Sequence, residues 1–243
     1  MASKEIDYKG NRFQLSYELV NPTQDKVLLV LHGWGSNKEI MKQAFGKTLP
    51  DFKHIYLDMP GFGKSNNEMI LTTVDYANIV QLFLDELGVK ASIAMGHSFG
   101  GKVSTLLNTP CLVLLSSAGI LTVKPWSVKV KIATFKLLKP LGMKKIRELF
   151  VAPDVQGMSH EMYETFKNVV DEDFEASFAR SKSRALCFWG KEDTATPLYT
   201  GEKIAGLIEN SDFYPLDGDH FFFLTHKDFI AQTITEQCKE LTK

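Results

Sequence analysis

Short, nearly unbroken runs of apolar residues, separated by stretches with helical spacing, constrain the fold of this chain most. A strand in which apolar and polar residues do not alternate is buried on both faces. Strands that alternate with helices form parallel sheets covered by helices on both sides. The sequence therefore predicts an α/β fold with a mostly parallel central sheet. The runs stand at 26–31, 54–58, 91–95, 111–115 and 184–190, with a last short one at 211–216.

Two further patterns complete the predicted sheet and its helices. Residues 4–20 alternate between apolar and polar around Lys9-Gly10-Asn11, which indicates a hairpin that adds an antiparallel edge. Helical spacing follows most of the apolar runs, with Asn37 as one candidate N-cap and Gly88 as one stop. These signals predict helices at about 38–47, 73–87, 198–208 and 225–242.

The alternation of strands and helices lapses for about sixty residues after residue 119. Helical spacing continues at 127–150, with a break at Lys139-Pro140-Leu141-Gly142, and two more helices are expected at 158–170 and 172–182. The sequence thus predicts a core formed by 1–119 and 183–243 with a helical lid inserted at 120–182.

The predicted lid has an uneven distribution of charge. Eight Lys or Arg and no acid lie between Lys124 and Arg147, whereas seven acids and one lysine lie between Asp154 and Glu175. Charge runs are usually solvated faces, so two helical faces that attract each other are the simpler interpretation. The alternative is that the basic half draws in an anionic substrate or lies on an anionic surface.

Charge and cysteine usage argue against several classes of protein. The net charge of −1 is unlike that of a general nucleic-acid binder. Cys111, Cys187 and Cys238 form no CxxC or Cys/His cluster, so no metal site is expected. Cys111 and Cys187 lie within apolar runs and are interpreted as buried thiols in a reducing compartment.

The N-terminal residues contain no apolar segment of the secretory kind, and no apolar stretch approaches the length that spans a bilayer. The sequence therefore predicts a soluble cytoplasmic protein, monomeric or homodimeric, that acts on a small molecule and binds no nucleic acid.

One short segment fits a known catalytic pattern. Gly96-His97-Ser98-Phe99-Gly100 follows the run at 91–95 and matches the nucleophile elbow G-x-S-x-G. In that pattern a strand turns sharply at the serine into a helix, and the close approach of the backbone requires glycine on both sides. The alternative is an ordinary glycine-rich loop, because three such positions recur by chance in about one chain in ten of this length.

Four more motifs follow strands of their own, and the carboxyl ends of parallel strands meet at one edge of a sheet. In order and spacing, the elbow and these motifs resemble the serine α/β-hydrolase superfamily, in particular its lidded, esterase-like members. The motifs are His32-Gly33-Trp34-Gly35, Asp58-x-Pro60-Gly61-x-Gly63-x-Ser65, Trp189-Gly190-x-x-Asp193-x-x-x-Pro197 and Gly218-Asp219-His220.

The resemblance implies a catalytic triad of Ser98, Asp193 and His220. A serine hydroxyl is a weak nucleophile at neutral pH, so His220 would take its proton, and Asp193 would orient His220. Glu192 stands one residue away from the position of the acid in the family. Some relatives place the acid after the preceding strand, where this sequence has Ser116-Ser117-Ala118-Gly119 and no carboxylate.

The resemblance also implies an oxyanion hole formed by the backbone N–H groups of Trp34 and Phe99. The lid at 120–182 is expected to contribute to substrate binding. Acyl transfer by such a site requires no metal and no organic cofactor.

Other polar residues near the motifs receive structural interpretations. Asp217 and Asp219 flank His220 too closely in sequence to reach its ring and are read as turn residues. The turn from Asp58 to Ser65 is structural in the family. The remaining histidines are expected to be structural or exposed: His32, His54, His97, His160 and His226.

The function implied is hydrolysis of a small or medium carboxylic ester, or of a thioester, through an acyl-enzyme on Ser98. The His32-Gly33-Trp34-Gly35 loop resembles that of esterases that demethylate acyl-carrier esters in biotin synthesis, although His97 stands where those have tryptophan. A carbon–carbon bond hydrolase acting on a diketone is the alternative within the superfamily. A ligand-binding or inactive relative is the alternative from another class.

Overall fold

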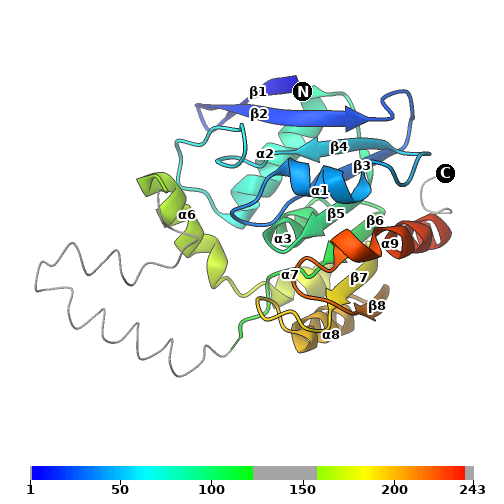
Figure 1. Cartoon of the computed structure of the whole chain (residues 1–243). Helices are drawn as coiled ribbons and strands as arrows, with labels where there is room; N and C mark the ends of the chain where they lie inside the picture. The colour runs from blue at the N-terminus through cyan, green and yellow to red at the C-terminus, as the bar shows by residue number, and fades with distance from the viewer. Residues whose placement is uncertain (1, 123–157, 239–243) are drawn as a thin grey trace, which may run out of the picture.

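An eight-stranded sheet forms the centre of the computed structural model, which describes residues 2–122 and 158–238 (Figure 1). The strand order is β1-β2-β4-β3-β5-β6-β7-β8. The strands are β1 (Ala2–Tyr8), β2 (Asn11–Val20), β3 (Val27–Leu31), β4 (Lys53–Leu57), β5 (Ala91–His97), β6 (Cys111–Leu115), β7 (Arg184–Gly190) and β8 (Ser211–Leu216).

The pairing of the strands confirms the predicted mixture of parallel and antiparallel neighbours. β4, β3, β5, β6, β7 and β8 pair in parallel, while β1 with β2 and β2 with β4 pair antiparallel. The β1–β2 hairpin turns through Lys9 and Gly10, both with positive φ, as the favoured two-residue hairpin turns require. All residues of β3 and β6 are buried, as expected of strands covered on both faces.

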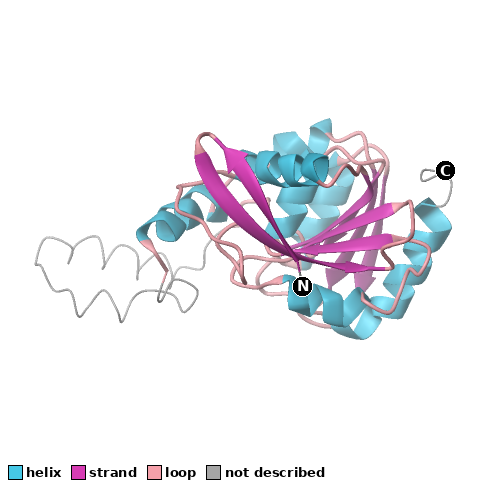
Figure 2. Cartoon of the chain, turned by 90° about the horizontal axis from the view of Figure 1, so that it is seen from above, coloured by secondary structure: helices cyan, strands magenta, loops and turns pink. Residues whose placement is uncertain are grey.

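Helices cover both faces of the twisted sheet (Figure 2). On one face, α1 (Lys38–Phe45) and α9 (Phe223–Cys238) contribute to an apolar core with Phe45, Leu186 and Ile230. On the other face lie α2 (Thr73–Glu86), α3 (Phe99–Leu106) and α8 (Leu198–Leu207). Asn37 accepts a hydrogen bond from Glu39 N as the N-cap of α1, as the sequence predicts.

The described end of the predicted lid begins with α6 (His160–Val170), which confirms the helix expected at 158–170, and continues with α7 (Glu175–Arg180). Phe174 and Phe178 are buried against residues of β6 and β7. The helices expected at 127–150 and most of the basic run lie outside the described residues. The division of the chain into core and lid stays a prediction.

Lys102 of α3 ties α6 to the core. Its ammonium donates to the carbonyl oxygen of Val169 at 2.7 Å and to the carboxylate of Glu172 at 2.7 Å. The side chain of Lys102 is 1% exposed. Because Val169 lies in the last turn of α6, the positive charge also complements the negative end of the helix dipole.

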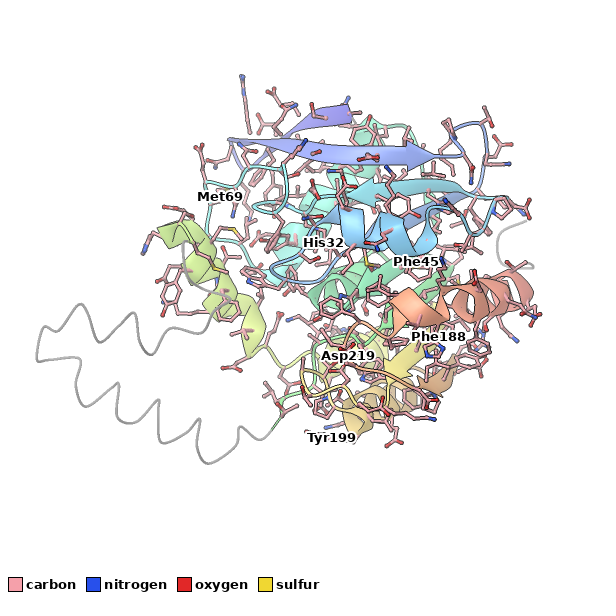
Figure 3. All side chains as sticks on the ribbon, viewed as in Figure 1. His32, Phe45, Met69, Phe188, Tyr199 and Asp219 are labelled. Carbon is pink, nitrogen blue, oxygen red and sulfur yellow. A yellow bond between two sulfur atoms is a disulfide. The ribbon has the colours of Figure 1, made fainter. Side chains whose placement is uncertain are left out.

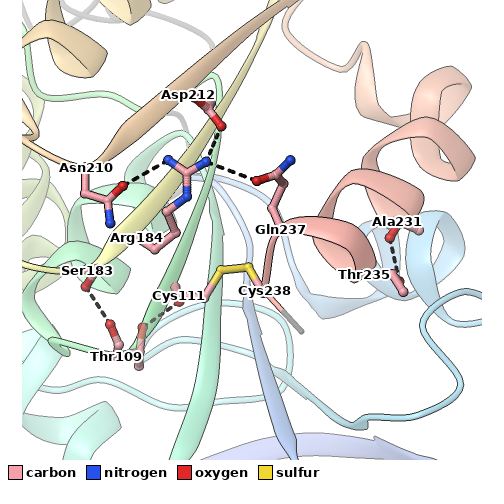
Figure 4. Close-up of a disulfide and its surroundings, with 10 residues drawn as sticks. All are labelled: Thr109, Cys111, Ser183, Arg184, Asn210, Asp212, Ala231, Thr235, Gln237 and Cys238. Carbon is pink, nitrogen blue, oxygen red and sulfur yellow. Dashed lines mark hydrogen bonds and ion pairs between the residues drawn. A yellow bond between two sulfur atoms is a disulfide. The ribbon is translucent and has the colours of Figure 1, made fainter. Parts of the chain in front are cut away.

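The interpretation of Cys111 and Cys187 as buried thiols is wrong for Cys111 and confirmed for Cys187. Cys111 and Cys238 form a disulfide with a Cα–Cα distance of 6.3 Å, and Cys187 is a free, buried thiol (Figure 4). Cys111 begins β6 and Cys238 ends α9, so the pair forms where the last helix crosses the sheet. A separation of 127 residues gives no spacing signal from which sequence patterns could have predicted it.

Candidate active site

The turns that follow β3, β4, β5, β7 and β8 meet at the edge formed by the carboxyl ends of the parallel strands. His32 and Asp219, both labelled in Figure 3, mark the β3 side and the β8 side of this edge. All five sequence motifs thus lie at one edge of one sheet.

Ser98 stands at the sharp turn between β5 and α3. Its φ of 51° lies in the left-handed region, which non-glycine residues adopt at a cost. Backbone hydrogen bonds hold the turn: Ser98 N donates to Leu115 O at 3.0 Å, and both Gly101 N and Ala118 N donate to Ser98 O, at 3.0 and 3.1 Å. A Cβ at Gly100 would lie 2.5 Å from the carbonyl oxygen of His32, so this position requires glycine. The geometry is that of a nucleophile elbow.

Asp193 and His220 form a close pair across the loops that follow β7 and β8. His220 Nδ1 lies 2.7 Å from Asp193 Oδ2. The side chain of Asp193 has no exposed surface, whereas that of His220 is 18% exposed. A carboxylate shielded from solvent, beside an imidazole that is partly exposed, is the arrangement expected of an acid that orients a catalytic histidine.

The pKa of Asp193 is lowered to about 2. Burial alone would raise it, but the hydrogen bond and charge of His220 and the backbone N–H of Thr196 favour the carboxylate more strongly. Asp193 is therefore ionised throughout the neutral range.

Thr196 is a site residue that the sequence analysis missed. Its N–H donates to Asp193 Oδ1 at 2.9 Å, and its hydroxyl donates to Asp193 Oδ2 at 2.9 Å. Ala195 N donates to Oδ1 as well, at 2.8 Å. The signal was present as Asp193-Thr194-Ala195-Thr196, because an aspartate three residues before a threonine commonly forms a turn closed by its own side chain.

The alternative carboxylates lie elsewhere, in agreement with the sequence analysis. Glu192 accepts a hydrogen bond from the backbone N–H of Gly218. Asp217 pairs with Lys191 at 2.7 Å, and Asp219 accepts from Phe221 N at 2.8 Å. All three shape the loop that carries His220.

The loop after β3 packs against the elbow. His32 is buried, donates from Nδ1 to Gly33 O at 2.8 Å and accepts from Met59 N at 3.1 Å. Burial lowers the pKa of His32 to about 4, so its ring is neutral and can make both bonds. A Cβ at Gly33 would lie 3.2 Å from Ser98 Cβ, which shows how closely the loop approaches the serine.

The backbone N–H groups of Trp34 and Phe99 lie on these adjoining loops. Within the described part of the chain, neither donates a hydrogen bond to another residue. The two aromatic rings are in contact, with centroids 5.5 Å apart. The ring of Phe166 of α6 also contacts that of Trp34, with centroids 5.4 Å apart. The described end of the predicted lid thus reaches the loop expected to form the oxyanion hole.

Ser98 and His220 are brought to the same edge without a hydrogen bond between their side chains among the described residues. The ring of His220 contacts that of His97, the neighbour of Ser98, with centroids 4.6 Å apart. Catalytic hydrogen bonds in enzymes without substrate are often long and tighten in the complex.

Comparison with known proteins identifies the architecture. A family model described as the α/β hydrolase fold matches residues 26–109. The structure of a thermophilic esterase from Thermogutta terrifontis superposes on the whole of both chains with a TM-score of 0.73 at 17% identity. At this identity the likeness establishes the fold.

Two curated relatives match along most of their length. An uncharacterized hydrolase of Bacillus subtilis, YugF, is 26% identical, over 82% of this chain and 85% of that protein. A pimeloyl-acyl-carrier-protein methyl ester esterase of Proteus mirabilis is 24% identical, over 88% of this chain and 93% of that protein.

Proposed function

We propose that this chain, which has the α/β-hydrolase fold, is a serine hydrolase that cleaves a small or medium carboxylic ester, or a thioester. The observation that carries the proposal is the 2.7 Å pair of Asp193 and His220 beside the strained turn at Ser98. A buried carboxylate that orients a partly exposed imidazole next to a serine elbow is the machinery of acyl transfer.

In the first half of the reaction, Ser98 Oγ attacks the carbonyl carbon while His220 Nε2 takes the hydroxyl proton. Asp193 holds the proton on Nδ1 and stabilises the imidazolium that forms. The carbonyl oxygen becomes an oxyanion that accepts from the N–H groups of Trp34 and Phe99. Collapse of this intermediate breaks the bond to the leaving group, which receives its proton from His220 Nε2.

In the second half, water attacks the acyl-enzyme. His220 Nε2 takes a proton from the water, and the same two N–H groups hold the second oxyanion. Release of the acid returns the proton to Ser98 Oγ. The sum of the two halves is one ester and one water converted to one acid and one alcohol or thiol.

Labelling with a fluorophosphonate tests the serine mechanism, since phosphonylation needs an activated serine. We expect the wild type to be labelled at one residue and Ser98→Ala to be unlabelled. Ser104→Ala is the control, because Ser104 lies on the helix that follows Ser98, and its buried hydroxyl has no partner among the described residues. A folded wild type that resists the reagent contradicts the proposal and favours a binding or inactive relative.

The ester assignment draws on the methyl ester esterase of Proteus mirabilis, which matches most of this chain. Aromatic side chains near Ser98 suit an apolar acyl group. The ring of Trp34 contacts both the ring of Phe62 and the ring of Phe99. A panel of esters of increasing acyl length, with thioesters and diketones included, tests the substrate class. A clear preference for the diketone would replace the ester proposal with that of a carbon–carbon bond hydrolase.

The remaining predictions on partners and location are separate proposals. Among the described residues, no helix has the length and apolar character that a membrane crossing needs. A cytoplasmic location and a monomeric or homodimeric state remain proposals from the sequence. The disulfide between Cys111 and Cys238 removes the thiol argument for a reducing compartment, because such bonds are uncommon there.

A further inference from the structure

His97 occupies the variable position of the elbow, next to Ser98, and contacts His220 and the loop after β3. It is the last residue of β5 and is 2% exposed. Its ring contacts the ring of His220 at a centroid distance of 4.6 Å and the ring of Phe223 at 4.9 Å. A Cβ at Gly33 would lie 2.9 Å from His97 Nδ1, so the oxyanion loop also packs on this ring.

A hydrogen bond joins His97 to the main chain of the candidate base. His97 Nε2 lies 2.9 Å from the carbonyl oxygen of His220. A carbonyl oxygen only accepts, so Nε2 carries the proton and His97 donates. Within the described part of the chain, no other hydrogen bond reaches the main chain of His220. Asp193 holds the ring of His220, and His97 holds its backbone.

The surroundings of His97 keep its imidazole neutral. Burial, followed by the neighbouring His220, lowers the pKa of His97 to about 3. His97 Nδ1 is buried without a partner among the described residues, and a second proton there would be an unpaired buried donor. Asp193 and His32 are the other titratable groups nearby, and their influence is smaller. A second imidazole can therefore lie against His220 without competing for the proton that His220 transfers.

We propose that His97 is a positioning residue that sets the place of His220 relative to Ser98. His97 is bonded covalently to Ser98 and by hydrogen bond to the backbone of His220, so a single side chain spans the nucleophile and the base. This inference rests on the proposed function, because it assigns His97 a part in that reaction. Small displacements of a positioned group slow a reaction strongly, so loss of the bond affects turnover more than substrate binding.

Two amide variants separate the hydrogen bond from the packing. In His97→Gln, the amide nitrogen reaches the place of Nε2 and can still donate to the carbonyl oxygen of His220. In His97→Asn, the side chain is one methylene shorter and reaches only the place of Nδ1. We expect the Gln variant to keep kcat for an activated ester within about threefold of the wild type. We expect the Asn variant to lose about tenfold, as one lost hydrogen bond implies, with KM little changed.

Partial unfolding of a variant would lower its apparent activity. The rate of fluorophosphonate labelling is therefore expressed per site labelled at completion, so that only reactive molecules are counted. His97→Met, which fills the space without a donor, provides a second comparison and should behave like the Asn variant. A direct signature is the low-field proton resonance of His220 Nδ1 hydrogen-bonded to Asp193. It should persist in the Gln variant and weaken by exchange in the Asn and Met variants.

The outcomes distinguish this inference from the proposed function. A folded wild type without labelling overturns the proposed function. A labelled wild type with equal rates in the Gln, Asn and Met variants overturns the role of His97 alone, and an unchanged His220 resonance in all three does the same. A slow Asn variant beside a fast Gln variant supports the positioning role.

Discussion

Two buried aspartates stand at the same edge of the sheet, each just after a strand, and they have different partners. Asp58 follows β4 and pairs with Lys38 at 2.6 Å, while Asp193 follows β7 and pairs with His220 at 2.7 Å. Both carboxylates are almost fully buried. The partner therefore decides what each pair can do.

The Asp58 pair is closed on every side. Lys38 is 2% exposed, and its backbone N–H and ammonium both donate to the Asp58 carboxylate. Lys64 N donates to the same carboxylate at 3.0 Å, and Ser65 Oγ donates to Asp58 O at 2.7 Å. These bonds join the start of α1 to the turn after β4. The pair therefore holds two loops together.

The Asp193 pair is closed only on the side of the acid. Asp193 accepts from Ala195, Thr196 and His220, but the ring of His220 is partly exposed at the edge where Ser98 lies. Histidine is the side chain whose ordinary pKa allows it to take and release a proton near pH 7. Burial of a carboxylate therefore does not show by itself whether the residue has a catalytic or a structural role. The proton chemistry and the exposure of its partner distinguish the two roles.

Among the variants that test this difference between the two pairs, Asp193→Asn is expected to have the largest effect. The amide has the size of the carboxylate, but it donates to His220 Nδ1 and so stabilises the wrong tautomer. We expect kcat for an activated ester to fall by about 10⁴. Steady-state kinetics and thermal unfolding measure the two effects separately. A loss of less than about tenfold in kcat would remove Asp193 from the triad and reopen the choice of acid.

Asp58→Asn should lower the stability of the fold and leave the activity nearly unchanged, in contrast to Asp193→Asn. It removes the close counter-charge of the buried Lys38 ammonium and leaves only the half-exposed carboxylate of Glu39, 3.8 Å away. Breaking a buried pair in this way costs about 3–5 kcal/mol of unfolding free energy. Activity per folded molecule should stay within a few-fold of the wild type, as measured against fluorophosphonate-titrated sites. Asp51→Asn is the control, since Asp51 is exposed. Equal unfolding free energies of Asp58→Asn and Asp51→Asn would mean that the Asp58 pair does not stabilise the fold.

The lowered pKa of Asp193 predicts how its pair responds to acid. The folded-state pKa of Asp193 is about 2, against 3.8 for an unperturbed aspartate. A lowered pKa contributes stability that is fully present above pH 3.8 and is lost as the pH falls toward 2. The shift corresponds to about 2 kcal/mol. The difference in unfolding free energy between the wild type and Asp193→Asn should therefore shrink by about this amount between pH 5 and pH 2, measured by urea unfolding. A difference that stays constant would contradict the stabilised carboxylate.

Much of the architecture could be predicted from the sequence because its signals are local. Unbroken apolar runs identify β3 and β6, and turn residues such as Lys9 and Gly10 identify the hairpin. The order of the motifs along the chain brings Asp193 near His220, because the carboxyl ends of parallel strands share an edge.

The contacts that sequence reasoning missed join residues that no local pattern connects. Lys38 reads as an ordinary helix-start lysine, yet it is buried against Asp58, 20 residues away. The bond from His97 to the backbone of His220 spans 123 residues, and its acceptor is a carbonyl that every residue has. The disulfide of Cys111 and Cys238 is of the same kind. Such pairs depend on the packing of α1, α9 and the loops, which sequence patterns do not specify.

The smallest effect is expected from removing one hydrogen bond by which the loop after β7 holds the carboxylate of Asp193. Thr196→Val keeps the shape of the side chain and removes the hydroxyl that donates to Asp193 Oδ2. Since one of four hydrogen bonds to the carboxylate is lost, we expect a fall in kcat of about five- to tenfold, which corresponds to roughly 1 kcal/mol. Thr200→Val is the control, because the hydroxyl of the buried Thr200 donates to Pro197 O, away from the acid. If both variants lose the same activity, the loop acts only as packing, and the acid is held by His220 and the backbone N–H groups alone.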